Sequence, residues 1–459
     1  MGSLPKTLPP CVAAHVASVP CKNSEDNVLS TNNYQNGALL PFQDSNLFQL
    51  EFRSRRQLCF GADVRPAYEL MFHQHGGKQL PLPPGSALGV ICPNVPNEVD
   101  KMLKLLNLSG NECIDITASA TDAQTKTRFE RSYAYLPSHC RIRHLFEYVV
   151  DLRTVLKKAF LKVLGDYCPE GSSDRQVLHE LSSINQEGYR TEVLEDRMMI
   201  FDLLTKFPTC QPTLAVLIEH LARLTPRFYT VANYSEMEIK FIYRPMEFKS
   251  LGRLLRGQCS TLFDRLQQVT SRDLETQLNN INLESIDTKT NNDSTVTCYV
   301  RKNVRNFTFP ISPAVPFIFV CHGTGIAPFL AYLHLLEANP DMMPIESWLF
   351  YGCRYAHRDA LFDVEAVRKS GFRCQLRQSR VDPITDDVGK IQRGYVQDGL
   401  LQYADDVRKL LVDDVGELLI CGDFQTMAKD TLSVLEKILT TQTLENLLKE
   451  NRIKFDVWT

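Results

Sequence analysis

Two different patterns of apolar and polar residues divide the chain. From about residue 316 to residue 439, short apolar runs of strand length alternate with stretches whose apolar residues recur every three or four positions. Continuous apolar runs such as residues 316–320 are typical of strands buried on both faces, and the alternation predicts a doubly wound parallel sheet. The expected strands are residues 317–320, 346–351, 372–377 and 417–421, and the expected helices are residues 327–337, 360–369, 396–403 and 425–439.

Upstream of residue 316 the pattern changes. Short strand-like runs separated by turn residues predict an antiparallel β-barrel, and a long central stretch carries apolar residues at helical spacing. Because strand patterning returns after that stretch, we expect a discontinuous barrel with a helical insert. The strand-like runs are residues 48–52, 68–72, 88–92, 228–232 and 238–243, and the helical runs are residues 95–108, 152–163, 176–183 and 197–204.

The chain therefore combines α+β and α/β architecture in several domains. Residues 1–46 are rich in Ser, Asn, Pro and Gln, which favours a disordered tail or linker, and residues 274–297 have the composition of a long polar surface loop. The expected domains are the barrel at residues 47–110 and 221–311, the helical connecting insert at residues 111–220, and the doubly wound domain at residues 312–459.

Composition limits the possible functions. The 459 residues carry a net charge of −3, so no overall charge indicates binding to nucleic acid or to an anionic membrane surface. No apolar run reaches the roughly 18 residues that a membrane span requires. The 14 cysteines form no C-x-x-C pair, so we expect thiols in a reducing compartment, the cytoplasm, and no metal site.

Candidate chemistry lies in the turns that follow the strands of the parallel sheet, because open sheets of this kind bind ligands at the carboxyl ends of their strands. The first turn, residues 321–328, has small residues that leave backbone N–H groups open to a pyrophosphate, although an ordinary tight turn has the same pattern. The later turns contain Cys353 with Arg354, Ser379 with Arg380, and Gly422 with Asp423.

The third of these turns favours NADPH over NADH. A hydroxyl at Ser379 and guanidinium groups at Arg380 and Arg393 would bind a phosphate through charge-assisted hydrogen bonds, and Tyr395 would stack on a base. As an alternative to cofactor binding, the arginines would be solvated surface charges, and Cys353 would only fill space in the core.

Taken together, these motifs resemble the ferredoxin–NADP reductase-like half of the diflavin reductases, from about residue 48 to residue 459. The sequence C-H-G-T-G-I-A-P-F at residues 321–329 is similar to the family's G-P-G-T-G-I-A-P-F loop, and Y-G-C-R, S-R, Y-V-Q, C-G-D and D-V-W follow in the family's order. The NADPH-binding residues that the resemblance and the turns imply are Gly323, Thr324, Gly325, Cys353, Arg354, Ser379, Arg380, Arg393, Tyr395, Gln397 and Asp423.

An FAD site is also implied by the resemblance. R-F-Y-T at residues 227–230 resembles the family's R-x-Y-S/T motif, in which the arginine pairs with the FAD pyrophosphate, the tyrosine stacks on the isoalloxazine and the hydroxyl lies beside the reactive nitrogen. The implied catalytic residues are Thr230, Cys353, Asp456 and Trp458, and the implied FAD-binding residues are Arg227, Tyr229, Thr230, Gly257, Gln258, Cys259, Ser260 and Trp458.

The implied partner is an FMN- or flavodoxin-like carrier. FMN is not expected on this chain, because the first 46 residues are too few for such a domain. Residues 89–94 and 203–212 resemble the family members that serve methionine synthase, so the cobalamin of that enzyme is the expected final acceptor. The alternatives are a cytochrome- or ferredoxin-coupled reductase, or a degenerate, non-catalytic binding module with the same fold.

One departure from the family lies at the head of the pyrophosphate loop. Cys321 and His322 replace Gly-Pro. We expect the His322 side chain to cap the turn, and any loss of NADPH affinity to originate at these two residues.

Overall fold

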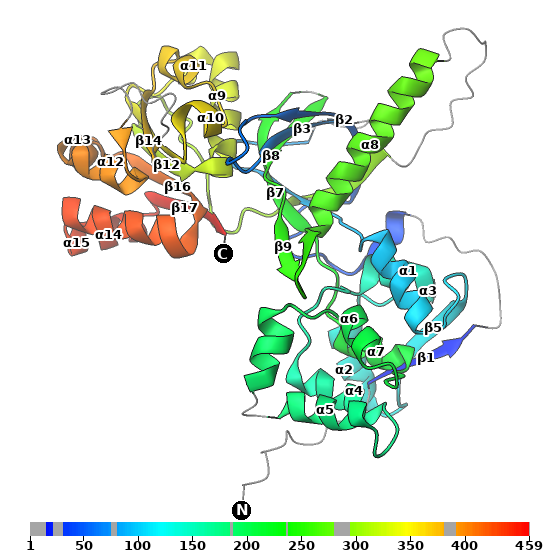
Figure 1. Ribbon diagram of the computed structural model, residues 1–459. Helices are drawn as coiled ribbons and strands as arrows, with labels where there is room; N and C mark the ends of the chain where they lie inside the picture. Colours follow the sequence, from blue (N-terminus) through cyan, green and yellow to red (C-terminus); the bar gives the residue numbers. More distant parts are fainter. Residues whose placement is uncertain are drawn as a thin grey trace, which may run out of the picture. The chain divides into compact units, whose positions relative to one another are not determined.

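The computed structural model describes residues 15–21, 31–74, 80–183, 187–235, 237–279, 294–380 and 392–458. The chain forms two compact units (Figure 1). Within the described ranges, no helix is both long and apolar enough to cross a membrane. The helical unit comprises Met1–Pro41, Ile91–Arg227 and Met246–Arg265, and the barrel–sheet unit comprises Phe42–Val90, Phe228–Pro245 and Leu266–Thr459.

The carboxyl-terminal part of the barrel–sheet unit is a parallel sheet of six strands, in the order β15-β14-β13-β12-β16-β17. It confirms the predicted doubly wound architecture, and it adds the two edge strands β15 and β17, which the sequence pattern did not predict. The strands are β12 (Phe317–His322), β13 (Ser347–Cys353), β14 (Arg373–Gln378), β15 (Gln392–Arg393), β16 (Glu417–Asp423) and β17 (Ile453–Trp458).

Helices cover both faces of this sheet (Figure 1). The central strand β12 is buried on both sides: Phe317 and Phe319 pack in one apolar core, and Ile318 and Val320 pack in the other. This explains the continuous apolar run at residues 316–320. The helices are α9 (Ala327–Ala338), α10 (Ala356–Asp359), α11 (Val364–Lys369), α12 (Val396–Gln402), α13 (Ala404–Arg408), α14 (Lys429–Ile438) and α15 (Thr441–Lys449).

The other part of this unit is a closed barrel in the strand order β11-β2-β3-β8-β7-β4. The paired strands are antiparallel, which confirms the predicted barrel. Its strands are β2 (Phe48–Gln57), β3 (Tyr68–Gln74), β4 (Ala87–Val90), β7 (Arg227–Tyr234), β8 (Glu238–Tyr243) and β11 (Thr295–Arg301).

The helical unit surrounds a separate apolar core that includes Leu145, Phe146, Leu161 and Leu217. It also contains the three-stranded sheet β1-β5-β6 and the hairpin β9-β10. Its helices are α1 (Pro96–Leu105), α2 (Ala123–Tyr133), α3 (Ile142–His144), α4 (Lys158–Asp166), α5 (Ser173–Ser182), α6 (Ile200–Lys206) and α7 (Leu214–His220), and its strands are β1 (Val16–Pro20), β5 (Cys113–Ala118), β6 (His139–Arg141), β9 (Glu247–Ser250) and β10 (Arg253–Arg256).

Three expected boundaries are wrong in part. Residues 1–46 are not simply a tail, because β1 pairs antiparallel with β5. Residues 91–110, 221–227 and 246–265 belong to the helical unit rather than to the barrel. The supposed polar loop is entered by helix α8 (Gln258–Asn279) and by β11, and its remainder, residues 280–293, lies outside the described residues.

Candidate functional site

A cavity of about 680 Å³ lies at the carboxyl ends of the parallel strands. Strands β12, β13 and β14 all end beside it, as expected for a doubly wound sheet. Several of the residues predicted from the sequence line it: Gly323, Cys353, Arg354, Ser379, Tyr395 and Gln397, together with His322. The Tyr395 side chain is 61% exposed, so its ring is available to stack on a base at the rim.

The glycine turn at Gly323–Ile326 joins β12 to helix α9. Gly323 has a left-handed backbone, with φ of +53°, and a Cβ there would meet only the Arg244 Nε atom, at 4.0 Å. At Gly325 a Cβ would lie 2.4 Å from the carbonyl oxygen of Cys421 on strand β16. The turn therefore requires glycine at both positions, for backbone conformation at the first and for close packing at the second.

We expect Gly325→Ala to be the more damaging of the two alanine substitutions in this turn. The added methyl group would push the loop away from β16, at a cost of about 2–3 kcal/mol in the free energy of unfolding. Gly323→Ala should cost about 1 kcal/mol, the strain of a left-handed alanine. Urea unfolding of both variants measures the difference, and equal losses would contradict this account of the turn.

Some predicted NADPH-binding residues do not line the cavity: Thr324, Gly325, Arg380, Arg393 and Asp423. Asp423 instead caps the turn after β16, because its Oδ1 atom accepts hydrogen bonds from Thr426 N, at 2.8 Å, and from Thr426 Oγ1, at 2.6 Å. These bonds, the side-chain bond foremost, lower the pKa of Asp423. Thr426 itself does line the cavity.

His322 does not cap the turn, contrary to expectation. It occupies the first capping position, but its side chain makes no capping hydrogen bond, and the residue forms part of the cavity wall. Burial lowers the pKa of His322, and the nearby Asp423 carboxylate opposes that shift without cancelling it. The imidazole is therefore neutral at neutral pH and can take up a proton when an anion binds.

A pH dependence of NADPH binding follows from this position. As the pH falls from about 8 to about 6, we expect protonation of His322 beside a phosphate to lower the KM for NADPH by roughly fivefold, or about 1 kcal/mol. The variant His322→Gln should lose that part of the dependence. If its pH profile matches that of the unaltered protein, the residue does not contact the phosphate.

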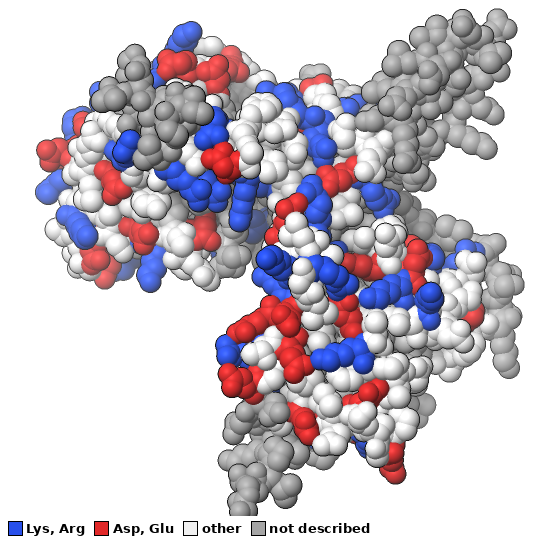
Figure 2. Space-filling view, viewed as in Figure 1, with Lys and Arg blue, Asp and Glu red and all other residues white. Residues whose placement is uncertain are grey.

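Two arginines that the sequence motifs did not identify also line the cavity, Arg65 and Arg244. Both come from the barrel side of the unit. Arg244 is bonded to the buried carboxylate of Asp359 and to the backbone carbonyl of Arg65, and Asp359 also accepts a hydrogen bond from Arg354 N, at 3.2 Å. Basic and acidic side chains are interspersed over the face shown in Figure 2, so attraction of an anionic cofactor depends on these local guanidinium groups.

A second cluster of predicted residues lies where β7 meets the terminal strand β17. Thr230 Oγ1 donates to Asp456 Oδ2 at 3.3 Å, and Arg301 Nη1 lies 3.8 Å from Asp456 Oδ1. Burial raises the pKa of Asp456, although Arg301 and Thr230 pull it down. The structure thus brings together the predicted pair Thr230 and Asp456, and adds Arg301, which carried no sequence motif.

Cys353 ends strand β13 and is half-buried. Burial, reinforced by Asp359, raises the pKa of the Cys353 thiol to about 12. The group is therefore a neutral thiol at physiological pH, not a nucleophilic thiolate. It suits contact with a flat, uncharged ring better than covalent chemistry.

Two aromatic residues predicted to face the flavin differ in how they pack against the rest of the protein. Tyr229 stacks on Phe241, with ring centroids 6.0 Å apart. Trp458, in the edge strand β17, is 43% exposed. A large exposed aromatic plane of this kind can cover a flat ligand.

The remaining predicted FAD residues lie in the helical unit. Arg227 donates to the carbonyl oxygen of Thr225, at 2.6 Å, and to Gln258 Oε1, at 2.7 Å. Gln258 in turn donates to Asn94 Oδ1 at 2.6 Å. The segment Gly257, Gln258, Cys259 and Ser260 forms the amino-terminal end of α8, where backbone N–H groups lack helical partners and favour an anion. Together with the Arg227 guanidinium, this donor set fits a pyrophosphate.

Comparisons with known proteins identify two kinds of binding domain in the chain. A family model described as FAD binding domain matches residues 40–262, and one described as Oxidoreductase NAD-binding domain matches residues 319–433. The chain is 31% identical to methionine synthase reductase of Homo sapiens over 401 residues and to that of Bos taurus over 405 residues, alignments that each cover 82% of this chain and 56% of the relative. It is 24% identical over 440 residues to NADPH–cytochrome P450 reductase of Drosophila melanogaster, covering 91% of this chain and 59% of that protein.

The chain thus spans little more than half the length of these relatives. The matched regions include the barrel strands other than β11, the helical insert and most of the parallel sheet. Over an FAD-binding region and an oxidoreductase NAD-binding region, the chain is thus similar to the corresponding half of the diflavin reductases.

Proposed function

We propose that this chain is an NADPH-dependent FAD reductase that passes electrons on to an FMN- or flavodoxin-like carrier. The observation that carries the proposal is the cavity at the carboxyl ends of β12, β13 and β14. A glycine turn, a neutral thiol and several guanidinium groups converge there, which is the chemistry that a phosphorylated nicotinamide cofactor requires.

Each part of NADPH has candidate contacts. The turn at Gly323 would present backbone N–H groups to the pyrophosphate, supported by the guanidinium groups of Arg244 and Arg354. Ser379 and Arg380 would bind the 2′-phosphate, together with Arg393, and Tyr395 would stack on the adenine. These assignments predict discrimination against NADH, because the exposed guanidinium groups of Arg380 and Arg393, beside the cavity rather than in its wall, would lose their anionic partner.

Bound FAD would accept the hydride and release electrons singly, which is chemistry that the cofactor supplies. The side chains position the donor and stabilise charge. The carboxylate of Asp456, held by Thr230, would face the positive charge that develops on the nicotinamide as hydride leaves. Cys353 would pack against the same ring as a neutral thiol, and Trp458 would cover the flavin until the nicotinamide replaces it.

We further propose methionine synthase as the final acceptor and the cytoplasm as the location. Support for the acceptor comes from the similarity to proteins named methionine synthase reductase. Support for the location comes from the many scattered cysteines, which suit a reducing compartment.

The acceptor proposal is tested with purified protein and a separately prepared flavodoxin-like FMN domain. NADPH should drive rapid reduction of ferricyanide by the chain alone, while reduction of cytochrome c and reactivation of methionine synthase should require the FMN domain. Cytochrome c reduction at the same rate without the FMN domain would favour a directly cytochrome-coupled enzyme. A protein that carries no flavin would favour a non-catalytic module.

A further inference from the structure

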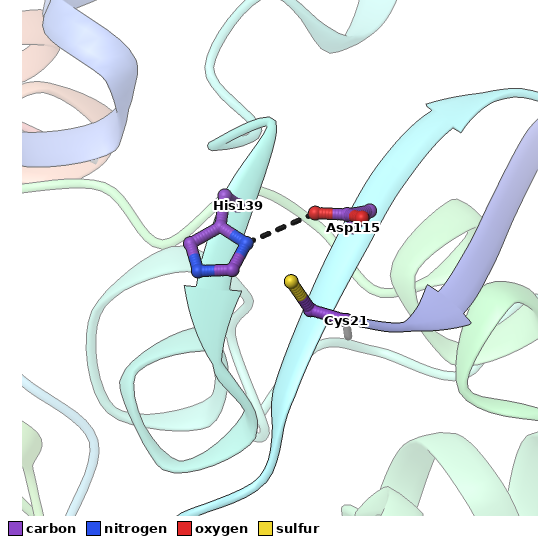
Figure 3. Close-up of side chains that lie close together, drawn as sticks. All are labelled: Cys21, Asp115 and His139. Atoms are coloured by element: carbon purple, nitrogen blue, oxygen red, sulfur yellow. Dashed lines mark hydrogen bonds and ion pairs between the residues drawn. The ribbon is translucent and has the colours of Figure 1, made fainter. Parts of the chain in front are cut away.

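Three side chains capable of binding a metal ion converge on the small sheet of the helical unit. Cys21, Asp115 and His139 each offer a ligand atom, and these atoms lie within 4.8 Å of one another (Figure 3). The His139 Nδ1 atom is 2.9 Å from Asp115 Oδ1. All three residues are half-buried, so the cluster is neither enclosed in the apolar core nor fully exposed to solvent.

The register of the sheet explains why they meet. Asp115 on β5 is directly paired with His139 on β6. On the other side, Pro20 of β1 is paired with Ile114, and Cys21 N donates to Cys113 O at 3.0 Å, so Cys21 stands opposite Cys113. Because alternate residues of a strand share a face, Cys21 and His139 lie on the same face as Asp115.

The opposite face of this sheet is the core face. Ile114 and Ile116 of β5 are buried there, as is Cys140 of β6. The three ligands therefore project from the solvent side of a sheet whose other side is fixed by apolar packing. Rigid strands hold the ligand atoms in place better than loops would.

A thiolate, an imidazole nitrogen and a carboxylate oxygen form a donor set suited to zinc. Zinc binds such ligands at about 2.0–2.3 Å in a tetrahedral arrangement, which separates the ligand atoms by roughly 3.3–3.7 Å. The Nδ1 to Oδ1 distance of 2.9 Å would need to open by only a few tenths of an ångström. The ion would take the place of the proton that now lies between them.

We propose that Cys21, Asp115 and His139 form a zinc site in which water is the fourth ligand. The thiolate and the carboxylate balance the charge of Zn²⁺, so the occupied site is neutral. Each ligand belongs to a different strand or follows one, so the ion would tie strand β1 to strands β5 and β6 within the helical unit. The site shares no residue with the proposed NADPH and FAD contacts, and the inference does not depend on them.

Calorimetric titration of the full chain, freed of metal by a chelator, tests the proposal with Zn²⁺ as the probe. We expect one zinc ion per chain, with X-ray absorption at the zinc edge showing a sulfur ligand at about 2.3 Å and nitrogen or oxygen ligands at about 2.0–2.2 Å. Cys21→Ser and His139→Gln should each weaken binding by at least about tenfold.

Cys113→Ser is the matched control, because Cys113 lies on the same face of β5 but outside the trio. It should bind zinc as the unaltered chain does. Zinc should also raise the melting temperature of the unaltered chain and of Cys113→Ser, but not of Cys21→Ser, since an ion that binds only the folded state stabilises it. The proposal is overturned if no stoichiometric binding occurs, or if Cys21→Ser binds as tightly as the control.

Discussion

Replacing Asp456 by Asn is expected to slow the reduction of bound flavin by NADPH about 100-fold. The substitution keeps the shape of the side chain and its hydrogen bond with Thr230, but removes the negative charge. That charge is held in a partly desolvated position, 3.8 Å from the Arg301 guanidinium, where electrostatic stabilisation is stronger than in water. The rate is measured by anaerobic stopped-flow absorbance at saturating NADPH.

The same carboxylate predicts an acid limit on the reaction. Because burial raises the pKa of Asp456, protonation should remove the stabilising charge at a higher pH than for an exposed aspartate. The flavin reduction rate should therefore fall as the pH drops through that raised pKa. In Asp456→Asn the rate should not fall over this pH range. The control Asp341→Asn alters an exposed carboxylate on the same unit and should leave rate and profile unchanged. An Asp456→Asn variant as fast as this control would contradict the proposed role.

Arg227→Ala is expected to lower the affinity for FAD about 100-fold, which corresponds to about 3 kcal/mol. The guanidinium is oriented by Thr225 and Gln258, and a charge-assisted bond to the pyrophosphate would be lost with it. Its removal would also leave the Gln258 carbonyl oxygen, in a side chain only 6% exposed, without the arginine donor. Equilibrium titration of flavin-stripped protein with FAD measures the loss.

Two further variants separate flavin binding from folding. Arg227→Lys keeps the charge but not the forked geometry, so it should fold normally and retain an intermediate affinity. Arg190→Ala removes an arginine whose side chain is 59% exposed on the helical unit, and it should bind FAD normally. If Arg227→Ala is well folded and purifies with a full complement of FAD, the assignment of this arginine to the cofactor is wrong.

The sequence alone was sufficient to predict where the site residues within local motifs lie in the fold. Gly323 and Cys353 each follow or end an apolar strand, so their placement at the carboxyl edge of the sheet follows from strand order alone. The structure places both on the cavity wall. The closed barrel and the parallel sheet were likewise predictable, because each has a distinct hydrophobic period.

Residues brought in by tertiary packing were not predictable in this way. Arg65 and Arg244 are 179 positions apart, and they reach the cavity only because of how the barrel strands are closed and connected. Arg301 is also brought to its site by tertiary packing, because its strand β11 pairs with β2 and β4, which lie more than 200 positions earlier in the sequence. No local sequence pattern indicates that these arginines lie near the predicted site residues in the fold.

Short edge strands were missed for a related reason. Strand β1 has only five residues, and its place is fixed by backbone pairing with β5. The three potential zinc ligands were therefore invisible as a motif, because Cys21 lies 94 positions from Asp115 and 118 positions from His139. Strand pairing, not spacing in sequence, brings them together.

The most direct test of the central claim is anaerobic mixing of the purified chain with stoichiometric NADPH, followed at the flavin absorbance band. The account predicts that the extracted flavin is FAD, that the band bleaches within the mixing experiment, and that NADH at the same concentration bleaches it far more slowly. A bound FAD that stays oxidised in the presence of NADPH would contradict the account.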